Sequence, residues 1–183
     1  KNQGAFVELL SDFSQAFFLT AGLRYDDNED FGANTSFRLS TAFLLETRAG
    51  TLKFKAALGS GFRAPSPFEI QYNRGPYAFP PATSSPLVQE ESRGWEVGAQ
   101  LDAEKYHLEA IIFDQSVNNA IVFDLIGYSG YIQDIGRGAS SGIELIADYR
   151  ITQALSASAN YTYNEADRPD AVSYTHLRAH ETR

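Results

Sequence analysis

The residues best suited to contact a ligand lie in one long segment, 63–92, that interrupts an otherwise regular chain. Tyr72, Arg74, Tyr77 and Phe79 combine flat aromatic faces with a cation, a set that can stack on or bind a planar ligand or a metal chelate. The same side chains could instead pack against one another, and the sequence leaves both roles open. Loops of this length are typically functional or disordered.

Arg63 stands at the start of that segment, in the run Arg63-Ala64-Pro65. Pro65 and Pro67 lack the backbone N–H that a sheet ladder needs, so they predict the end of a strand. We therefore expect Arg63 mainly to anchor the top of this strand. A direct contact between its guanidinium and a ligand is the alternative.

Two sets of residues have side chains that could bind a metal ion, but each set has a better explanation. The acidic residues within 26–30 offer oxygen ligands for Ca²⁺, but EF-hand spacing is absent and a solvated hairpin tip is expected. His176 and His180 are spaced four apart, as two imidazoles on one metal can be. They fall in the stretch 172–183, "VSYTHLRAHETR", which shares no pattern with the preceding residues and resembles adaptor read-through. We interpret it as a non-native tail and predict no metal site.

Signals for catalysis are poor. His107 is the one histidine outside the tail, and no Gly-x-Ser-x-Gly elbow accompanies it. Carboxylate pairs such as Glu90 with Glu91, or Glu96 with Asp102, could in principle serve a glycosidase, but the sequence does not fix their separation. We expect rim or lumen charges, no enzyme and no cofactor.

Composition excludes several classes of protein. The 183 residues carry a formal net charge of -8, which argues against a nucleic-acid partner. No run of about 18 apolar residues exists, so no transmembrane helix is predicted. The chain has no Cys, which excludes disulfides, and no Met. Because a strand pattern begins by Ala5, we interpret the chain as an interior fragment, with 1–171 as part of one domain.

Alternation of apolar and polar residues dominates the chain and predicts β-strands. Apolar residues of one parity occupy six clear segments: Phe17 to Tyr25, Phe37 to Leu45, Leu52 to Leu58, Trp95 to Leu101, Ile143 to Tyr149 and Leu155 to Tyr163. Further segments bring the total to about eight strands in an antiparallel up-and-down meander, with short turns at one end and long loops at the other. The alternation slips within 111–117 and 136–142, which predicts two β-bulges.

Two folds share this alternation. A soluble sandwich buries the apolar face as its core, whereas an outer-membrane barrel turns that face to lipid. Runs of about 10 to 12 residues match the length of a strand that crosses a bilayer. Arg38, Lys53 and Arg150 lie on the opposite parity from the apolar stripe, and Tyr25 and Trp95 stand near strand ends, as in an aromatic girdle. The pattern favours the barrel and leaves a soluble all-β carbohydrate-binding module as the alternative.

The segment "GSGFRAPSPFEI" resembles the strand-end signature of TonB-dependent outer-membrane receptors. A loop follows, then "SSPLVQEESRGWEVGAQ", and later "YIQDIGRGASSGIEL", each similar to a family motif in the family's order. Ser85 stands where Asn is usual, so the loop exit is a variant. The matching residues are Gly61, Phe62, Arg63, Ala64, Pro65, Pro86, Leu87, Glu91, Trp95, Glu96, Gly98, Gly142 and Glu144.

The resemblance implies a 22-stranded transmembrane β-barrel closed around an N-terminal plug, in the outer membrane of a Gram-negative bacterium. Such a receptor captures a scarce ligand of the cobalamin or ferric siderophore type and imports it with energy from TonB, which contacts a TonB box before the plug. The plug and TonB box are missing from this sequence, which would supply part of the wall and external loops. The expected partners are outer-membrane lipid, TonB and the ligand. The residues expected to contact that ligand are Arg63, Tyr72, Arg74, Tyr77 and Phe79.

Overall fold

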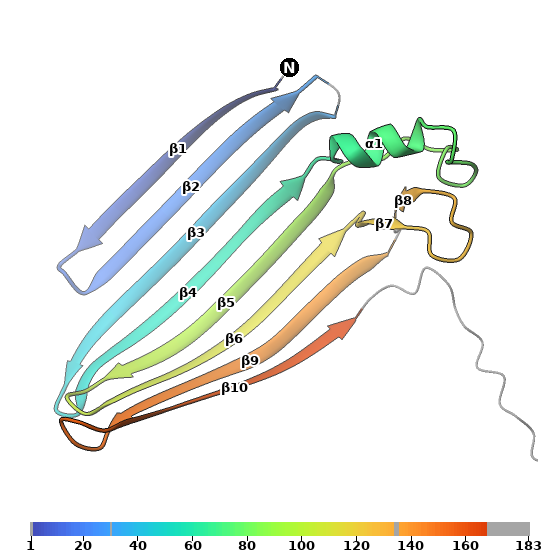
Figure 1. Ribbon diagram of the computed structural model, residues 1–183. Helices are drawn as coiled ribbons and strands as arrows, with labels where there is room; N and C mark the ends of the chain where they lie inside the picture. Colours follow the sequence, from blue (N-terminus) through green and yellow to red (C-terminus); the bar gives the residue numbers. More distant parts are fainter. Residues whose placement is uncertain (1, 30, 134–135, 168–183) are drawn as a thin grey trace, which may run out of the picture.

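The computed structural model describes residues 2–29, 31–133 and 136–167. Eight long strands form a single antiparallel sheet (Figure 1). In spatial order they are β1 (Asn2–Phe13), β2 (Phe17–Asn28), β3 (Gly32–Thr47), β4 (Gly50–Arg63), β5 (Glu90–Asp102), β6 (Tyr106–Asn118), β9 (Arg137–Arg150) and β10 (Ser156–Asp167). Two short strands, β7 (Ile121–Phe123) and β8 (Tyr131–Gln133), pair separately, and one helix, α1, spans Pro67–Asn73.

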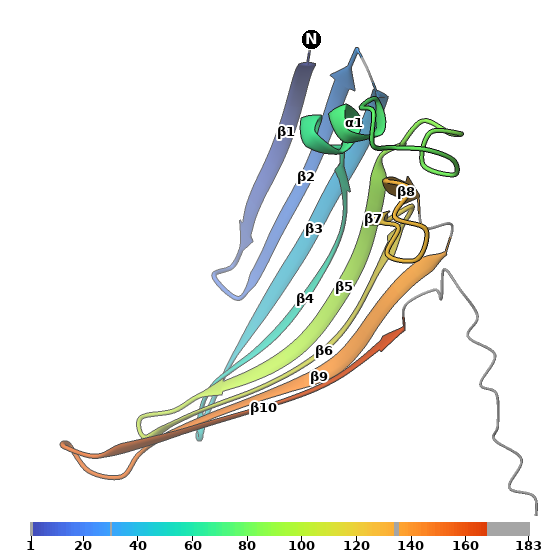
Figure 2. The ribbon, with the colours of Figure 1, turned by 45° about the vertical axis from the view of Figure 1, so that its right-hand side comes forward.

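The strands follow one another as an up-and-down meander, which confirms the predicted topology. Tight turns join β1 to β2, β3 to β4, β5 to β6 and β9 to β10 at one end of the sheet (Figures 1 and 2). The other end, which we call the long-loop end, carries α1 and the β7–β8 hairpin. The stretch 172–183, interpreted from sequence as a tail, lies outside the described residues.

The two predicted bulges are wrong. The pairing of β5 with β6 runs without a break from Glu91↔Asn118 to Asp102↔His107, and that of β6 with β9 is equally continuous. The alternation fades because polar residues occupy both faces there: Asp114 and Ser116 continue the parity of Ile112 on β6. The sequence pattern therefore looked as if a residue had been inserted, although only the difference in hydrophobicity between the two faces is lost.

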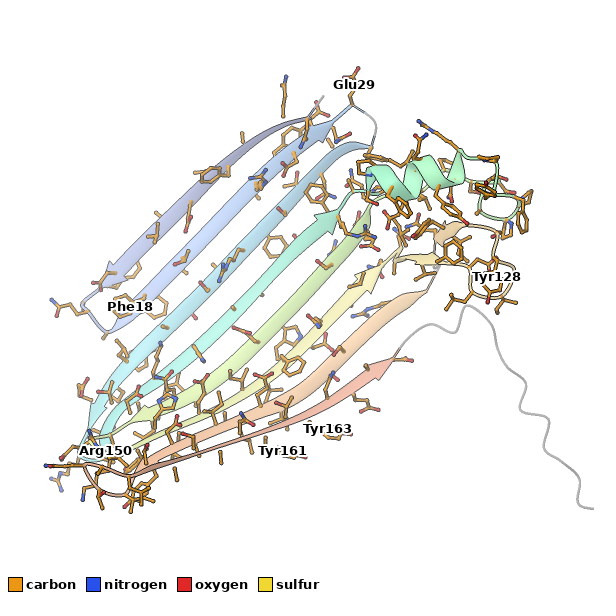
Figure 3. The ribbon with its side chains drawn as sticks, in the orientation of Figure 1. Phe18, Glu29, Tyr128, Arg150, Tyr161 and Tyr163 are labelled. Atoms are coloured by element: carbon orange, nitrogen blue, oxygen red, sulfur yellow. The ribbon has the colours of Figure 1, made fainter. Side chains whose placement is uncertain are left out.

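One face of the sheet is a broad, exposed apolar surface. Its members share the parity predicted from sequence, and Tyr161 and Tyr163 of β10 lie on it (Figure 3). The exposed large side chains on it include Val7, Leu9, Leu23, Tyr25, Phe37, Phe43, Leu45, Phe54, Leu58, Trp95, Val97, Leu108, Ile112, Ile143, Leu145, Tyr149, Tyr161 and Tyr163. We call this the apolar face.

The opposite face is mainly polar, although Phe6 and Leu10 of β1 are exposed on it, and we call it the inner face. On it Lys55 forms an ion pair with Glu109, and His107 Nδ1 lies 2.6 Å from a carboxylate oxygen of Asp102. Arg38 and Glu144 also have the parity of this face. These five charged side chains and His107 therefore lie off the apolar face, where desolvation would be costly.

The described residues do not form the second layer that a sandwich requires. Among the described residues, the only buried apolar side chains are Pro65, Ala82 and Ile121, and all three lie in connections at the long-loop end. No described segment covers the apolar face, so this part of the chain has no core of the kind that a soluble module buries. Among the same residues, no helix has the length and apolar character needed to cross a membrane.

Candidate ligand-binding cap

The two longest connections fold together into one structure, which we call the cap (residues 64–89 and 119–133; Figure 1). The first connection holds α1, and the second holds the β7–β8 hairpin. Residues 124–130 form the connection between β7 and β8. The sequence did not predict that these two connections would meet.

α1 begins where the proline run stops the sheet. β4 ends at Arg63, as predicted, but Pro67 then occupies the first turn of a helix, where its missing N–H is tolerated. Ser66 Oγ accepts a hydrogen bond from the Glu69 N–H at 3.2 Å, and the Glu69 carboxylate accepts one from the Ser66 N–H at 2.6 Å. This capping box fixes the start of the helix, which sequence reasoning missed although its signature was present.

Arg63 joins the sheet to both parts of the cap. Its guanidinium donates two hydrogen bonds to the Glu90 carboxylate, at 2.5 and 2.8 Å, and lies 3.1 Å from the buried carboxylate of Glu69. Glu90 also accepts the Ile121 N–H at 2.6 Å. The end of β4, helix α1 and the start of β5 thus meet at one guanidinium, and strand β7 is joined to it through Glu90. These donors, Arg63 first, hold the pKa of Glu90 below its ordinary value, although burial opposes them.

Asn73, the last residue of α1, ties the helix to β8. Its side-chain amide donates to the Tyr131 carbonyl at 2.7 Å and to the Ala82 carbonyl at 3.2 Å, and its oxygen accepts the Tyr131 N–H at 2.9 Å. Gly130 makes room for this contact: a Cβ there would lie 2.7 Å from Asn73 Oδ1, and its φ of 134° favours glycine.

A cluster of aromatic rings fills the space between α1 and the β7–β8 hairpin. Tyr72 packs edge-on against Phe123 and Tyr131, with ring centroids 5.5 and 5.6 Å apart. Phe68 contacts Tyr131, and Tyr128 contacts Phe123. Tyr128 lies in the connection between β7 and β8 (Figure 3). Aromatic pairs stabilise a fold by more than the apolar surface area that they bury. These contacts explain why the two loops pack together.

Asp124 holds the β7–β8 turn closed. Its carboxylate accepts the hydroxyl of the fully buried Ser129 at 2.7 Å and the N–H groups of Ile126 and Gly127 at 3.1 and 2.9 Å. These donors, led by the Ser129 hydroxyl, lower the pKa of Asp124. The Phe79 N–H in turn donates to the Ser129 carbonyl at 3.0 Å, which joins the turn to the first connection.

The cap also contacts the turn between β2 and β3. Gln89 donates its side-chain amide to the Phe31 carbonyl at 2.9 Å and accepts from the Asn34 amide at 3.1 Å. Gln133 bonds to the Val88 backbone N–H at 2.9 Å and so joins β8 to the same stretch. Three connections that are distant in sequence therefore meet at the long-loop end.

The five residues predicted to contact a ligand fall into two groups. Arg63 is engaged with carboxylates and Tyr72 with aromatic rings, so both have structural partners. Arg74, Tyr77 and Phe79 are exposed, Tyr77 at 78%. Sequence reasoning did not identify Glu69, Asn73, Asp124 or Gln89 as organising residues. Asn73 and Gln89 bind residues 58 positions away in sequence, whereas Glu69 and Asp124 also bind near neighbours, whose local signals were missed.

The residues of the sequence motifs identified above lie in different parts of the structure. Gly61 and Phe62 are still paired with β5, and Trp95 lies on the apolar face. Glycine at 142 is required by close packing, since a Cβ there would lie 2.8 Å from the ring of Phe113. Pro86 and Leu87 lie in the cap.

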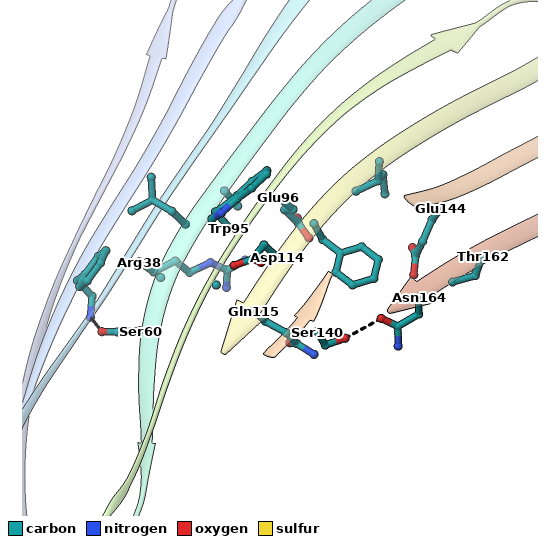
Figure 4. A pocket seen from close by; sticks show the side chains of 17 residues that line it. Arg38, Ser60, Trp95, Glu96, Asp114, Gln115, Ser140, Glu144, Thr162 and Asn164 are labelled. Atoms are coloured by element: carbon teal, nitrogen blue, oxygen red, sulfur yellow. Dashed lines mark hydrogen bonds between the residues drawn. The ribbon is translucent and has the colours of Figure 1, made fainter. Parts of the chain in front are cut away.

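An open hollow of about 630 Å³ lies along the middle strands (Figure 4). Arg38, Glu96 and Glu144 line it, and Ser140 bonds to Asn164 at its edge. Charges of both signs and amide groups therefore meet in this hollow. Such a surface suits contact with another polar surface better than with lipid.

The acidic residues within 26–30, which were predicted to form a solvated hairpin tip, are not all exposed. Asp26 is buried and forms an ion pair with Arg24 at 2.6 Å. Asp30 lies outside the described residues. No group of three or more potential metal-ligating His, Cys, Asp or Glu side chains occurs in the described part of the chain.

Comparisons with a family model and with known proteins point to the same family. Residues 1–180 match the family model for the TonB dependent receptor-like β-barrel. An uncharacterized TonB-dependent receptor of Haemophilus influenzae is 25% identical over 173 residues, which cover 90% of this chain and 49% of that protein. The vitamin B12 transporter BtuB of Vibrio cholerae is 25% identical over 150 residues, which cover 81% of this chain and 22% of the transporter. The chain thus spans half or less of the length of these relatives.

Solved structures show the same fold. The siderophore receptor PirA of Pseudomonas aeruginosa superposes with a TM-score of 0.71 at 24% identity, over 90% of this chain and 32% of PirA. The FrpB iron transporter of Neisseria meningitidis superposes with a TM-score of 0.68 at 19% identity, over 90% of this chain and 26% of FrpB.

Proposed function

The chain belongs to the TonB-dependent receptor β-barrel family, and on this premise we propose that it forms wall and external loops of an outer-membrane receptor that imports a scarce ligand of the cobalamin or ferric siderophore type. Relatives named as vitamin B12 and iron transporters support this range of ligands. The energy for import would come from TonB, through a plug and TonB box encoded elsewhere in the full protein.

One observation carries the proposal: the sheet is a single layer with an apolar face that no described segment covers. The strands are 12 to 16 residues long, more than the roughly 9 to 11 that a tilted strand needs to cross a bilayer. Lipid on this face would keep the exposed apolar side chains out of water. The inner face would then border the polar lumen and the plug.

The cap would lie outside the cell. In outer-membrane barrels the short turns face the periplasm and the longer loops face outward, and the cap is at the long-loop end. Arg74, Tyr77 and Phe79 are the predicted ligand contacts that remain exposed there. Arg63 and Tyr72 would act by holding the cap in place.

The transporter would need more strands than this chain supplies. The outer edges of β1 and β10 have no partner among the described residues, and unpaired backbone groups are costly in hydrocarbon. A complete barrel, of about 22 strands in this family, would pair both edges. We therefore expect the chain alone neither to insert nor to transport.

An uptake experiment tests the proposal. The full-length gene is expressed in a strain that lacks its own cobalamin and siderophore receptors, with and without functional TonB. We expect ligand-dependent growth or uptake of labelled cobalamin or a ferric siderophore, and its loss without TonB. Uptake that persists without TonB would contradict the mechanism. Recovery of the full protein as a soluble, carbohydrate-binding monomer would contradict the receptor itself.

A further inference from the structure

A pocket of about 450 Å³ lies where three connections meet at the long-loop end. One wall comes from α1 and its C-terminal cap, a second from residues 82–87, and the third from Phe31 beside β3. Its size falls within the range of small-molecule sites in proteins.

The walls of this pocket divide into an apolar side and a polar side. Phe31, Ile70 and Leu87 contribute hydrocarbon surface. Arg74 contributes the only formal charge among the lining residues, and Thr83 and Ser85 add hydroxyl groups. An amphipathic lining of this kind can orient a ligand that has one polar end and one apolar end.

The side chain of Arg74 differs from that of Arg63 in having no partner among the described residues. Within the described ranges, its guanidinium makes no hydrogen bond or ion pair, whereas that of Arg63 is saturated by two carboxylates. The neighbouring Asn73 amide is already committed to Tyr131 and Ala82. A guanidinium presents several donors in a fixed planar arrangement that matches a carboxylate or a phosphate.

We propose that this pocket binds a small organic anion, with a carboxylate or phosphate group on Arg74 and an apolar body against Phe31, Ile70 and Leu87. The proposal rests on the proposed function for one point, the exposure of the cap to the external medium. It deepens that function by assigning to Arg74 the recognition of the charged end of an external molecule. The net charge of the chain is -8, so the preference for an anion would be local to this pocket.

Fluorine NMR titration of the full-length receptor in nonionic detergent tests this assignment. The probes are 4-fluorobenzoate, 4-fluorophenyl phosphate and the neutral analogue 4-fluorobenzamide. We expect saturable binding of at least one of the two anions and at least tenfold weaker binding of the amide, since a hydrogen bond to a charged group contributes roughly that factor. The relative affinities of carboxylate and phosphate then tell which anionic group the pocket prefers.

Matched variants locate the site. Arg74→Gln should weaken anion binding about tenfold, whereas Arg48→Gln, in the tight turn between β3 and β4, should leave it unchanged. Leu87→Ala should weaken binding of both anions by shrinking the apolar wall. A normal heat-dependent shift on gels confirms that each variant is folded. Equal binding of the amide, an unchanged affinity in Arg74→Gln, or no binding of any probe would overturn the proposal.

The uptake assay separates this inference from the proposed function. If TonB-dependent uptake occurs but the probes fail to bind, the receptor stands and the anion site is wrong. If the probes bind at Arg74 but neither cobalamin nor a ferric siderophore is imported, the site stands and the proposed range of ligands is wrong.

Discussion

Arg63 and Glu90 form a doubly hydrogen-bonded ion pair across the last residue pair of the β4–β5 ladder. The pair closes the sheet at the point where the first connection of the cap leaves it. Because the same two side chains also hold Glu69 of α1 and the Ile121 N–H of β7, they set the position of the cap on the sheet. The following predictions all concern the full-length receptor.

Removal of Arg63 should loosen the cap. Arg63→Ala leaves the largely buried carboxylates of Glu69 and Glu90 without their cation, which we expect to cost about 2 kcal/mol of local stability. Hydrogen exchange of residues 64–89 and 119–133 should then quicken about 30-fold, as that free energy implies. Arg63→Lys should recover only part of the protection, because an ammonium cannot make the paired contact.

Arg137→Ala serves as the matched control for this prediction. Arg137 lies at the same end of the sheet, on β9, and its guanidinium has no hydrogen bond or ion pair within the described ranges. Its removal should leave exchange in the cap unchanged. Equal loosening by both variants would show that Arg63 acts only through general charge.

The hold of Arg63 on the cap should weaken in acid. The pKa of Glu90 is lowered in the folded protein, so its contribution to stability is fully present above the ordinary pKa of 4.5 and is lost as the pH falls through the folded value. Exchange in the cap, corrected for the intrinsic rate, should therefore rise in this acidic range. Glu90→Gln should show weak protection at neutral pH and a flatter response. A wild-type profile as flat as that of the variant would contradict this role.

Gly130 should tolerate no side chain. Alanine there would adopt an unfavourable positive φ and crowd Asn73 Oδ1, so Gly130→Ala should cost about 2 kcal/mol and break the bond to Tyr131. Exchange at Tyr131 should quicken. Gly138→Ala is the control, because a Cβ there meets only the Val117 carbonyl, 3.7 Å away. An unaffected Tyr131 amide in Gly130→Ala would mean that the cap is not built around this contact.

The sheet could be predicted from sequence because its physics is local. Alternation with period two places Leu145 and Glu144 on opposite faces whatever the partner strand, and the structure confirms the apolar face. The bulges were wrong because alternation also fades where both faces become polar, as at Asp114 and Ser116.

The cap could be predicted only in pieces. The end of β4 followed from Pro65, and the capping box of Ser66 and Glu69 could have revealed α1. The bond between Asn73 and Tyr131 joins residues 58 apart in sequence, and no local pattern encodes it. Arg63 is paired, whereas the Arg74 side chain has no partner among the described residues, and this difference likewise depends on which carboxylates the fold brings near.

Membrane assembly of two opposite-face variants tests the central claim most directly. Leu145 lies on the apolar face and pairs with Tyr161, and the next residue of β10, Thr162, points to the inner face at the same level. Arginine facing lipid near mid-bilayer costs roughly 2 to 4 kcal/mol. We predict that Leu145→Arg reduces the heat-modifiable, outer-membrane form of the full receptor severalfold, while Thr162→Arg assembles normally. Equal effects of the two substitutions would contradict a lipid-facing apolar face.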